Sequence, residues 1–165
     1  MKILGFAVLF FVLIAAAVLA TGQLGLLKGQ TPKDLGLHDG RLKQPSLTPN
    51  SVSSQADLYP NHPQRDFARI APLQFTGDAD KAMDRLEKTL RATDRTVVIT
   101  RDTDYLYAQS STALLKFTDD LEFWLDRPAG VIQLRSASRL GRKDFNVNRE
   151  RIEKIRTQFT QISPQ

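Results

Sequence analysis

The sequence predicts an α+β protein: an antiparallel sheet of four to five strands with two helices packed on one face, preceded by an N-terminal transmembrane or signal segment and an extended linker. Three observations predict this class: an uncharged apolar run at the N-terminus, a proline-containing stretch without periodicity, and helical and strand periods beyond it. The expected boundaries are 1–27 for the anchor or signal segment, 28–55 for the linker and 56–162 for a single α+β domain.

The N-terminal segment is apolar or glycine throughout residues 3–20, and no charge occurs between Lys2 and Lys28. A run of this length is enough for a helix to cross a membrane. A cleaved export signal is the alternative, because residues 18–20 include the small side chain that a signal peptidase favours. We expect a membrane anchor with the domain outside the cytoplasm, on the periplasmic side. Cleavage would instead release the domain into the periplasm, and basic residues after the segment leave the inverted orientation open.

The stretch from Lys28 to Pro72 holds six of the eight prolines and no apolar periodicity, so it is expected to be extended. Both histidines of the chain, His38 and His62, lie in this stretch. Isolated imidazoles in such a setting are solvated more often than they bind metal. Since the chain also has no cysteine, we expect no disulfide, no metal and no cofactor.

The rest of the chain alternates between helical and strand patterns. Apolar residues at helical spacing, each run preceded by capping residues, predict helices over 76–92 and 147–160. β-branched or alternating stretches predict four strands, over 96–100, 105–110, 113–126 and 131–138. Both helices are expected to cover the apolar face of the sheet.

The last two strands are joined by a Pro-Gly-containing turn, which fixes their register. With Asp126 opposite Val131, Glu122 faces Arg135 on the outer side of the sheet. The same count places Asp119 opposite a serine on the apolar side. A carboxylate in that position needs hydrogen-bond donors or a cation, so a buried polar cluster is expected around it.

Several short motifs point to a known family. They are Asn50-Ser51-Val52-Ser53-Ser54, Asp119-Asp120-Leu121-Glu122-Phe123, Arg135-Ser136-Ala137-Ser138-Arg139, Gly141, and Asp144 with Asn148-Arg149-Glu150-Arg151-Ile152-Glu153. Together they resemble domain-of-unknown-function family 1499, over roughly residues 45–160. The resemblance implies the extent of the fold and an N-terminal membrane or export segment, and it implies no reaction. Two departures are Ser51, where the family usually has cysteine, and Asn146, where it usually has glycine.

The candidate site consists of polar residues that the register and the last helix bring toward one another. They are Asp119, Arg135, Ser136, Ser138, Arg139, Asn148 and Arg149. One interpretation is a structural clamp, in which Asp119 accepts from the serines and from Asn148 or Arg149. The other is a pocket for an anion, formed by arginines and helix amides.

Catalysis is the less favoured interpretation. Asp119 and Asp120 are neighbours in a strand and point to opposite faces, so they cannot form an acid and base pair. No Gly-x-Ser-x-Gly motif occurs, and neither histidine lies in the expected domain core. A hydrolase-like or anion-binding site around Asp119, Ser138 and Arg149 remains the alternative.

The C-terminal part is basic: residues 135–165 carry eight basic and three acidic side chains. Aromatic platforms for bases are scarce there, so we expect no nucleic-acid partner. We expect instead a non-enzymatic interaction module of the cell envelope, in the membrane through residues 3–20, with an envelope protein or anionic lipid as partner.

Overall fold

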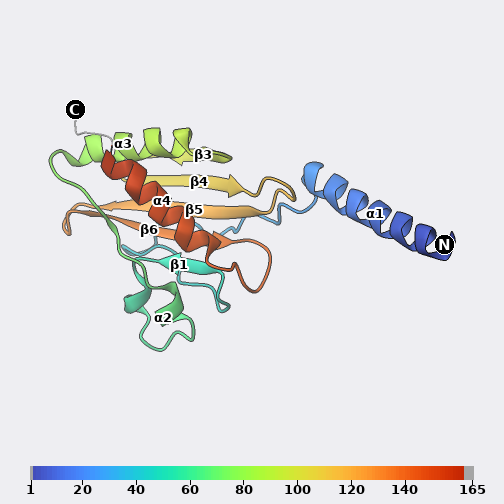
Figure 1. Ribbon diagram of the computed structural model, residues 1–165. Coiled ribbons are helices and arrows are strands. Elements are labelled where there is room, and N and C mark those ends of the chain that lie inside the picture. Colours follow the sequence, from blue (N-terminus) through green and yellow to red (C-terminus); the bar gives the residue numbers. More distant parts are fainter. Residues whose placement is uncertain (1, 162–165) are drawn as a thin grey trace.

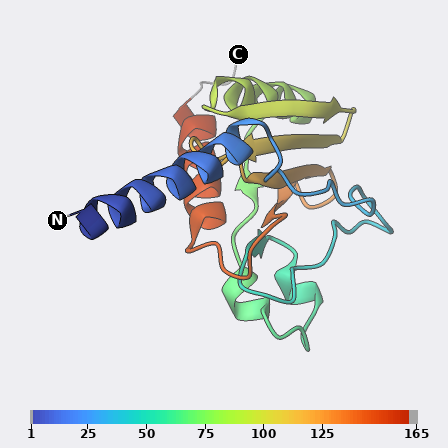
Figure 2. The ribbon, with the colours of Figure 1, turned by 90° about the vertical axis from the view of Figure 1, so that its right-hand side faces the viewer.

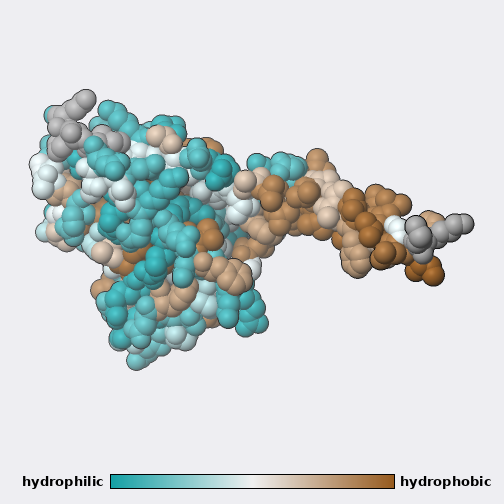
Figure 3. Space-filling model, in the orientation of Figure 1, coloured by the Kyte–Doolittle hydropathy of each residue, from teal (hydrophilic) through white to brown (hydrophobic). Residues whose placement is uncertain are grey.

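An apolar helix, α1 (Lys2–Gln23), forms the N-terminal end of the computed structural model, which describes residues 2–161. It projects away from the rest of the chain (Figure 1), and Figure 3 shows it as a mostly brown, hydrophobic rod beside a mostly hydrophilic body. From Ile3 to Gln23 the helix is long and apolar enough to cross a membrane, and its most apolar part is not buried in the protein. Length and composition fit a membrane anchor and a signal sequence alike.

The body is built on one antiparallel sheet, which confirms the predicted class. Its strands are β1 (Ser51–Ser53), β2 (Leu73–Gln74), β3 (Thr96–Arg101), β4 (Tyr105–Ser111), β5 (Thr118–Asp126) and β6 (Val131–Ser138). Their order is β1-β6-β5-β4-β3, and β2 also pairs with β6. β1 and β2 bring the number of strands above the range predicted for the sheet, because segments of three and two residues carry no readable alternation.

The register predicted for the β5–β6 hairpin is confirmed. Asp126 pairs with Val131, Glu122 with Arg135, and Asp119 with Ser138. The expectation that β5 begins at residue 113 is wrong, since 113–117 form a turn between β4 and β5. In this turn Lys116 has a φ of 56°, and the Phe117 amide donates to the Thr112 hydroxyl at 3.1 Å.

Two helices, α3 (Ala79–Ala92) and α4 (Val147–Gln161), cover one face of the sheet, as predicted. Asp78 caps α3 by accepting from the Lys81 amide at 2.9 Å. The core between helices and sheet is apolar and closed. Its largest fully buried members are Phe123, Phe159, Leu73, Met83, Leu86, Leu90, Leu106, Leu121, Leu125, Ile132 and Leu134. Two short helical turns, η1 (Ala56–Leu58) and α2 (Arg65–Ala68), lie beside β1.

The opposite face of the sheet is also covered, by residues 34–47, which we call the covering segment. Figure 2 shows the chain that follows α1, in blue, on one side of the sheet and α4, in red, on the other. Leu42 in this segment is buried, and its amide donates to the Gln55 side chain at 2.8 Å. The range 28–55, expected to be a linker, therefore supplies both β1 and a layer of the fold. Contacts made through backbone groups leave no periodic pattern, which explains why the sequence does not reveal this layer.

Candidate functional site

Asp119 lies near the start of β5 with its side chain toward the helices, and it is 4% exposed. Its carboxylate accepts a hydrogen bond at 2.5 Å from Arg151, which lies in the second turn of α4. Arg151 also donates to the Asn148 side-chain oxygen at 3.0 Å. The inward orientation of Asp119 agrees with the alternation of side chains along the predicted strand. The hydrogen-bond donor to its carboxylate is Arg151, and not Arg149 or a serine as expected.

Asn148, the second residue of α4, is fully buried and connects the polar groups around it. The Ser136 hydroxyl donates to its side-chain oxygen. Its side-chain nitrogen donates to the Ser138 hydroxyl at 2.9 Å and to the Asp144 carboxylate at 2.9 Å. It also donates to the Asn50 carbonyl at 3.1 Å, which joins β1 to the network. A network of this kind fixes the start of α4 on the sheet.

The three arginines of the candidate cluster lie elsewhere. Arg149 donates to the backbone carbonyls of Phe67 at 2.5 Å and Arg69 at 2.9 Å, which fastens α4 to the region around α2. Arg135 lies on the opposite face of the sheet, because odd-numbered residues of β6 point away from the helices. Arg139, directly after β6, pairs with Asp120 on that same face. The structure therefore brings Asp119 together with Ser136, Ser138 and Asn148, and it does not bring the arginines to them.

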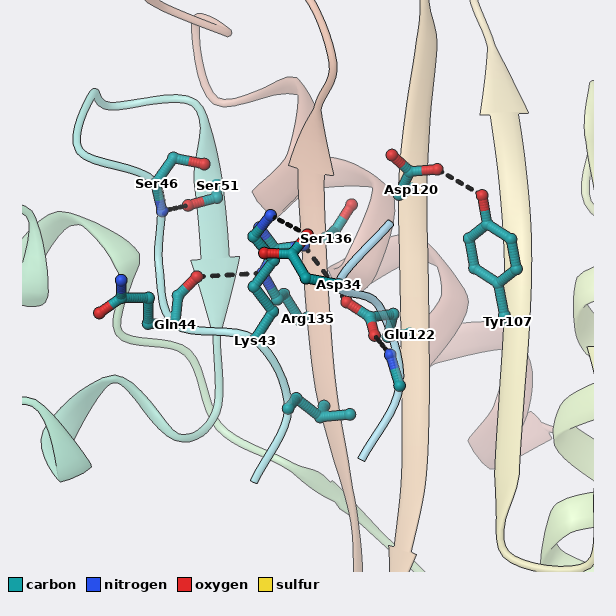
Figure 4. Close-up of polar contacts among 12 residues, drawn as sticks. Asp34, Lys43, Gln44, Ser46, Ser51, Tyr107, Asp120, Glu122, Arg135 and Ser136 are labelled. Atoms are coloured by element: carbon teal, nitrogen blue, oxygen red, sulfur yellow. Dashed lines mark hydrogen bonds and ion pairs between the residues drawn. The ribbon is translucent and has the colours of Figure 1, made fainter. Parts of the chain in front are cut away.

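On that opposite face, Glu122 and Arg135 form an ion pair that the covering segment buries (Figure 4). Their side chains are 0% and 3% exposed, and the two charged groups approach to 3.3 Å. Glu122 also accepts from the Tyr105 hydroxyl at 3.0 Å and the Gly36 amide at 2.8 Å. Arg135 donates in addition to the Gln44 carbonyl at 3.3 Å. The register placed this pair on the outer side of the sheet, and the covering segment buries it there.

Asp120 forms a second buried pair, with Arg139, at 2.7 Å. The Tyr107 hydroxyl donates to the same carboxylate at 2.6 Å. Burial, together with the neighbouring carboxylates, raises the pKa of both Tyr107 and Tyr105 above the ordinary value. Burial lowers the pKa of Arg135, although Glu122 and Asp120 oppose this shift. The charged groups of these two buried pairs thus each have an oppositely charged partner, an arrangement that favours a structural role over a chemical one.

An open pocket of about 260 Å³ lies at the end of the domain from which α1 leaves. Gln23, the last residue of α1, contacts this end by donating to the Leu114 carbonyl at 2.7 Å. The pocket is formed by the β4–β5 turn and the loop between β6 and α4. Its lining residues are Thr112, Phe117, Asp119, Ser138, Leu140, Gly141, Lys143, Asp144, Phe145 and Val147. Asp119 and Ser138 are the members of the predicted cluster that reach it.

Phe145 stands out in the loop beside this pocket. Its side chain is 85% exposed, and its φ of 52° is unusual for a bulky residue. Asn146 follows with a φ of 69°, a left-handed conformation that asparagine adopts more readily than most residues other than glycine. Phe145 and Lys143 also line a second pocket of about 300 Å³ with Pro49. Sequence reasoning passed over Phe145; the signal was an aromatic side chain directly after a basic pair and a helix-capping aspartate.

The chemistry available at the pocket is limited. The Asp119 carboxylate is held by Arg151, and the Ser138 hydroxyl accepts from Asn148. Within residues 2–161, no group of three histidine, aspartate or glutamate side chains is placed to hold a metal ion. What the pocket presents is a largely apolar wall, with Lys143 as the one basic residue of its lining.

Comparison with known proteins identifies a family for this chain. No curated protein and no solved structure matches the chain. The model of the family described as protein of unknown function (DUF1499) matches residues 41–159. This range runs from the covering segment through β1 and the sheet into the last turn of α4, so it includes both buried faces and the pocket. The chain belongs to the DUF1499 family.

Proposed function

We propose that the protein is a membrane-anchored, non-enzymatic binding module of the cell envelope, with α1 in the membrane and the domain on its periplasmic side. The ligand is an amphiphile with an anionic head, and the site is the pocket beside Phe145. The observation that carries this proposal is the position of a mostly apolar pocket, with Lys143 in its lining, next to the C-terminal end of an apolar helix.

The composition of the pocket supports an amphiphile. Phe117, Leu140 and Val147 offer apolar contact to a chain, and Lys143 offers a cation to a head group. The volume of about 260 Å³ falls just below the roughly 300–1,000 Å³ of most small-molecule sites. It therefore suits one segment of a larger molecule better than a whole metabolite.

The hydrolase-like alternative has one observation in its favour, because Asp119 and Ser138 line the same pocket. Its third member, Arg149, is engaged with backbone carbonyls near α2. Serine nucleophiles need a general base, and the hydrogen-bond partner of the Ser138 hydroxyl is the amide of Asn148. Binding without chemistry is therefore the proposal that the contacts favour.

Native mass spectrometry of the full chain, released from nonionic detergent with added phosphatidylglycerol, tests the proposal. Wild-type protein is expected to retain one anionic lipid. Leu140→Asp places a carboxylate at the pocket, and Leu58→Asp is a matched control, since the two leucines are 44% and 47% exposed. The fraction of protein that retains the lipid is expected to fall roughly tenfold in the Leu140→Asp variant and to stay unchanged in the control. Equal retention by both variants would reject this site.

The position of the domain is tested separately with a reporter active only in the periplasm, fused to the C-terminus. Signal is expected, together with retention of the chain in membranes after alkaline carbonate washing. Activity confined to the cytoplasm would overturn the proposed orientation, and release by carbonate would overturn the anchor.

A further inference from the structure

We infer that the end of the domain beside α1 sits in the membrane interface on anionic lipid, with Phe145 inserted among the lipids. This end, the rim, consists of residues 112–117 and 139–146. The inference deepens the proposed function and rests on its membrane anchor. It gives the orientation of the domain on the bilayer, in which the pocket opens toward the lipid.

The first support is the fixed junction between α1 and the rim. Gln23 donates to the backbone carbonyls of Leu114 at 2.7 Å and Ala113 at 3.4 Å. A Cβ atom on Gly22 would lie 2.7 Å from the Leu115 Cα, so the two backbones meet at a point that only glycine allows. The rim therefore lies where a membrane-spanning α1 leaves the bilayer.

The second support is the exposed apolar surface around this junction. Figure 3 shows brown and tan patches on the end of the mostly teal and white domain that lies next to α1. Leu114 is 66% exposed, Leu140 44% and Phe145 85%. Leu24 and Leu26, which follow α1 directly, are 76% and 70% exposed. Contiguous apolar surface next to a membrane helix is suited to the interfacial layer of a bilayer.

The third support is charge. Arg142 and Lys143 are exposed, Lys116 is half-buried, and the one acidic residue of the rim, Asp144, is buried and caps α4. Arg139 is paired with Asp120 on the other side of the sheet. The charge that the rim presents to its surroundings is thus positive, which complements anionic head groups.

The fourth support is the backbone at Phe145. A bulky residue with a φ of 52° is held in a conformation that glycine adopts more easily, and its ring is left in solvent. Neither local backbone preference nor packing within the domain accounts for a phenylalanine at this position. Insertion of the ring into an apolar phase accounts for both its exposure and its place at the tip of the loop.

The chain has no cysteine, so a single introduced thiol can be labelled specifically. An environment-sensitive fluorophore is attached to Phe145→Cys in the full chain, reconstituted into vesicles of phosphatidylcholine with or without phosphatidylglycerol. The matched control is Ala129→Cys, in the exposed turn at the other end of β5, about 30 Å away for a strand of nine residues. Spin-labelled lipid is expected to quench the probe at 145, more strongly with phosphatidylglycerol, and to leave the probe at 129 unquenched.

Lys143→Glu is then combined with the probe at 145, with Lys88→Glu on the exposed side of α3 as its control. The ratio of docked to undocked domain is expected to fall roughly fivefold or more for the first change and to stay constant for the second. If the chain remains in the membrane but the probe at 145 is as unquenched as the probe at 129, this inference is wrong and the anchor stands. If carbonate releases the chain from the membrane, both the anchor and this inference are wrong.

Discussion

Replacing Glu122 by glutamine is expected to destabilise the fold more than any change at the surface. The variant keeps an oxygen that accepts from Tyr105 and Gly36, but it leaves the Arg135 guanidinium, 3% exposed, without a counter-charge. Removing one partner of a buried ion pair costs about 3–5 kcal/mol. Domains of this size unfold with about 5–15 kcal/mol, so the loss is a large part of the whole.

The energy is apportioned with a double-mutant cycle. Arg135→Met alone leaves Glu122 as the uncompensated charge, and a loss of similar size is expected. When both changes are combined, neither charge remains buried, and the total loss should be smaller than the sum of the single losses by about 2–3 kcal/mol. Asp34→Asn, in the same covering segment, is the control, because the Asp34–Lys43 pair is exposed and worth about 0–1 kcal/mol.

Urea unfolding of the full chain in nonionic detergent measures these values through the fluorescence of Trp124, the one tryptophan of the chain, which lies on the same face of β5 as Glu122. A change below about 1 kcal/mol for Glu122→Gln, equal to that of the Asp34 control, would refute the reasoning. It would mean that water reaches the pair and that the covering segment does not seal this face.

Three further changes test the cluster, the tyrosines and the rim. Asp119→Ala, which leaves Arg151 unpaired, is expected to lower the free energy of unfolding by about 2–3 kcal/mol, and unchanged urea unfolding would reject the buried network. Burial, together with the hydrogen bond to Asp120, raises the pKa of Tyr107, so the folded state favours the neutral phenol over the phenolate. This contribution is complete below about pH 10 and is lost as the pH rises through the folded-state pKa, so Tyr107→Phe should flatten the alkaline fall in the urea midpoint; equal slopes would contradict it. Phe145→Gly relieves a left-handed φ and should raise the free energy of unfolding by up to about 1 kcal/mol in thermal denaturation, whereas a clear loss would show that the ring packs on the domain.

The hairpin and the burial of Asp119 were predictable because two rules agree on them. A tight turn fixes the register, and the alternation of apolar residues fixes whether the odd-numbered or the even-numbered residues of each strand face the helices. The partner of Asp119 was harder to predict, since Arg149 and Arg151 both lie near the start of α4. Asn148 and Arg151 are three residues apart and share a face of the helix, while Arg149 points aside.

The burial of Glu122 and Arg135 was beyond the reach of the sequence pattern. An alternating strand with charges on one side indicates a face in water, and in most sheets it is one. Here a segment without regular structure shields those charges through individual contacts such as Gly36 to Glu122. Neither proline content nor hydropathy distinguishes such a segment from a free linker. Phe145 was missed for a related reason, since one aromatic in a polar loop has no periodicity to reveal it.

The covering segment also determines where the protein can be cut. A fragment that starts at residue 56 lacks β1 and leaves the buried charges of β5 and β6 open to solvent along one side. A fragment that starts at residue 41, where the family match begins, still lacks the Gly36 amide that Glu122 accepts from. The shortest stable soluble form is therefore expected to begin before Asp34, with the helix removed and the following chain retained.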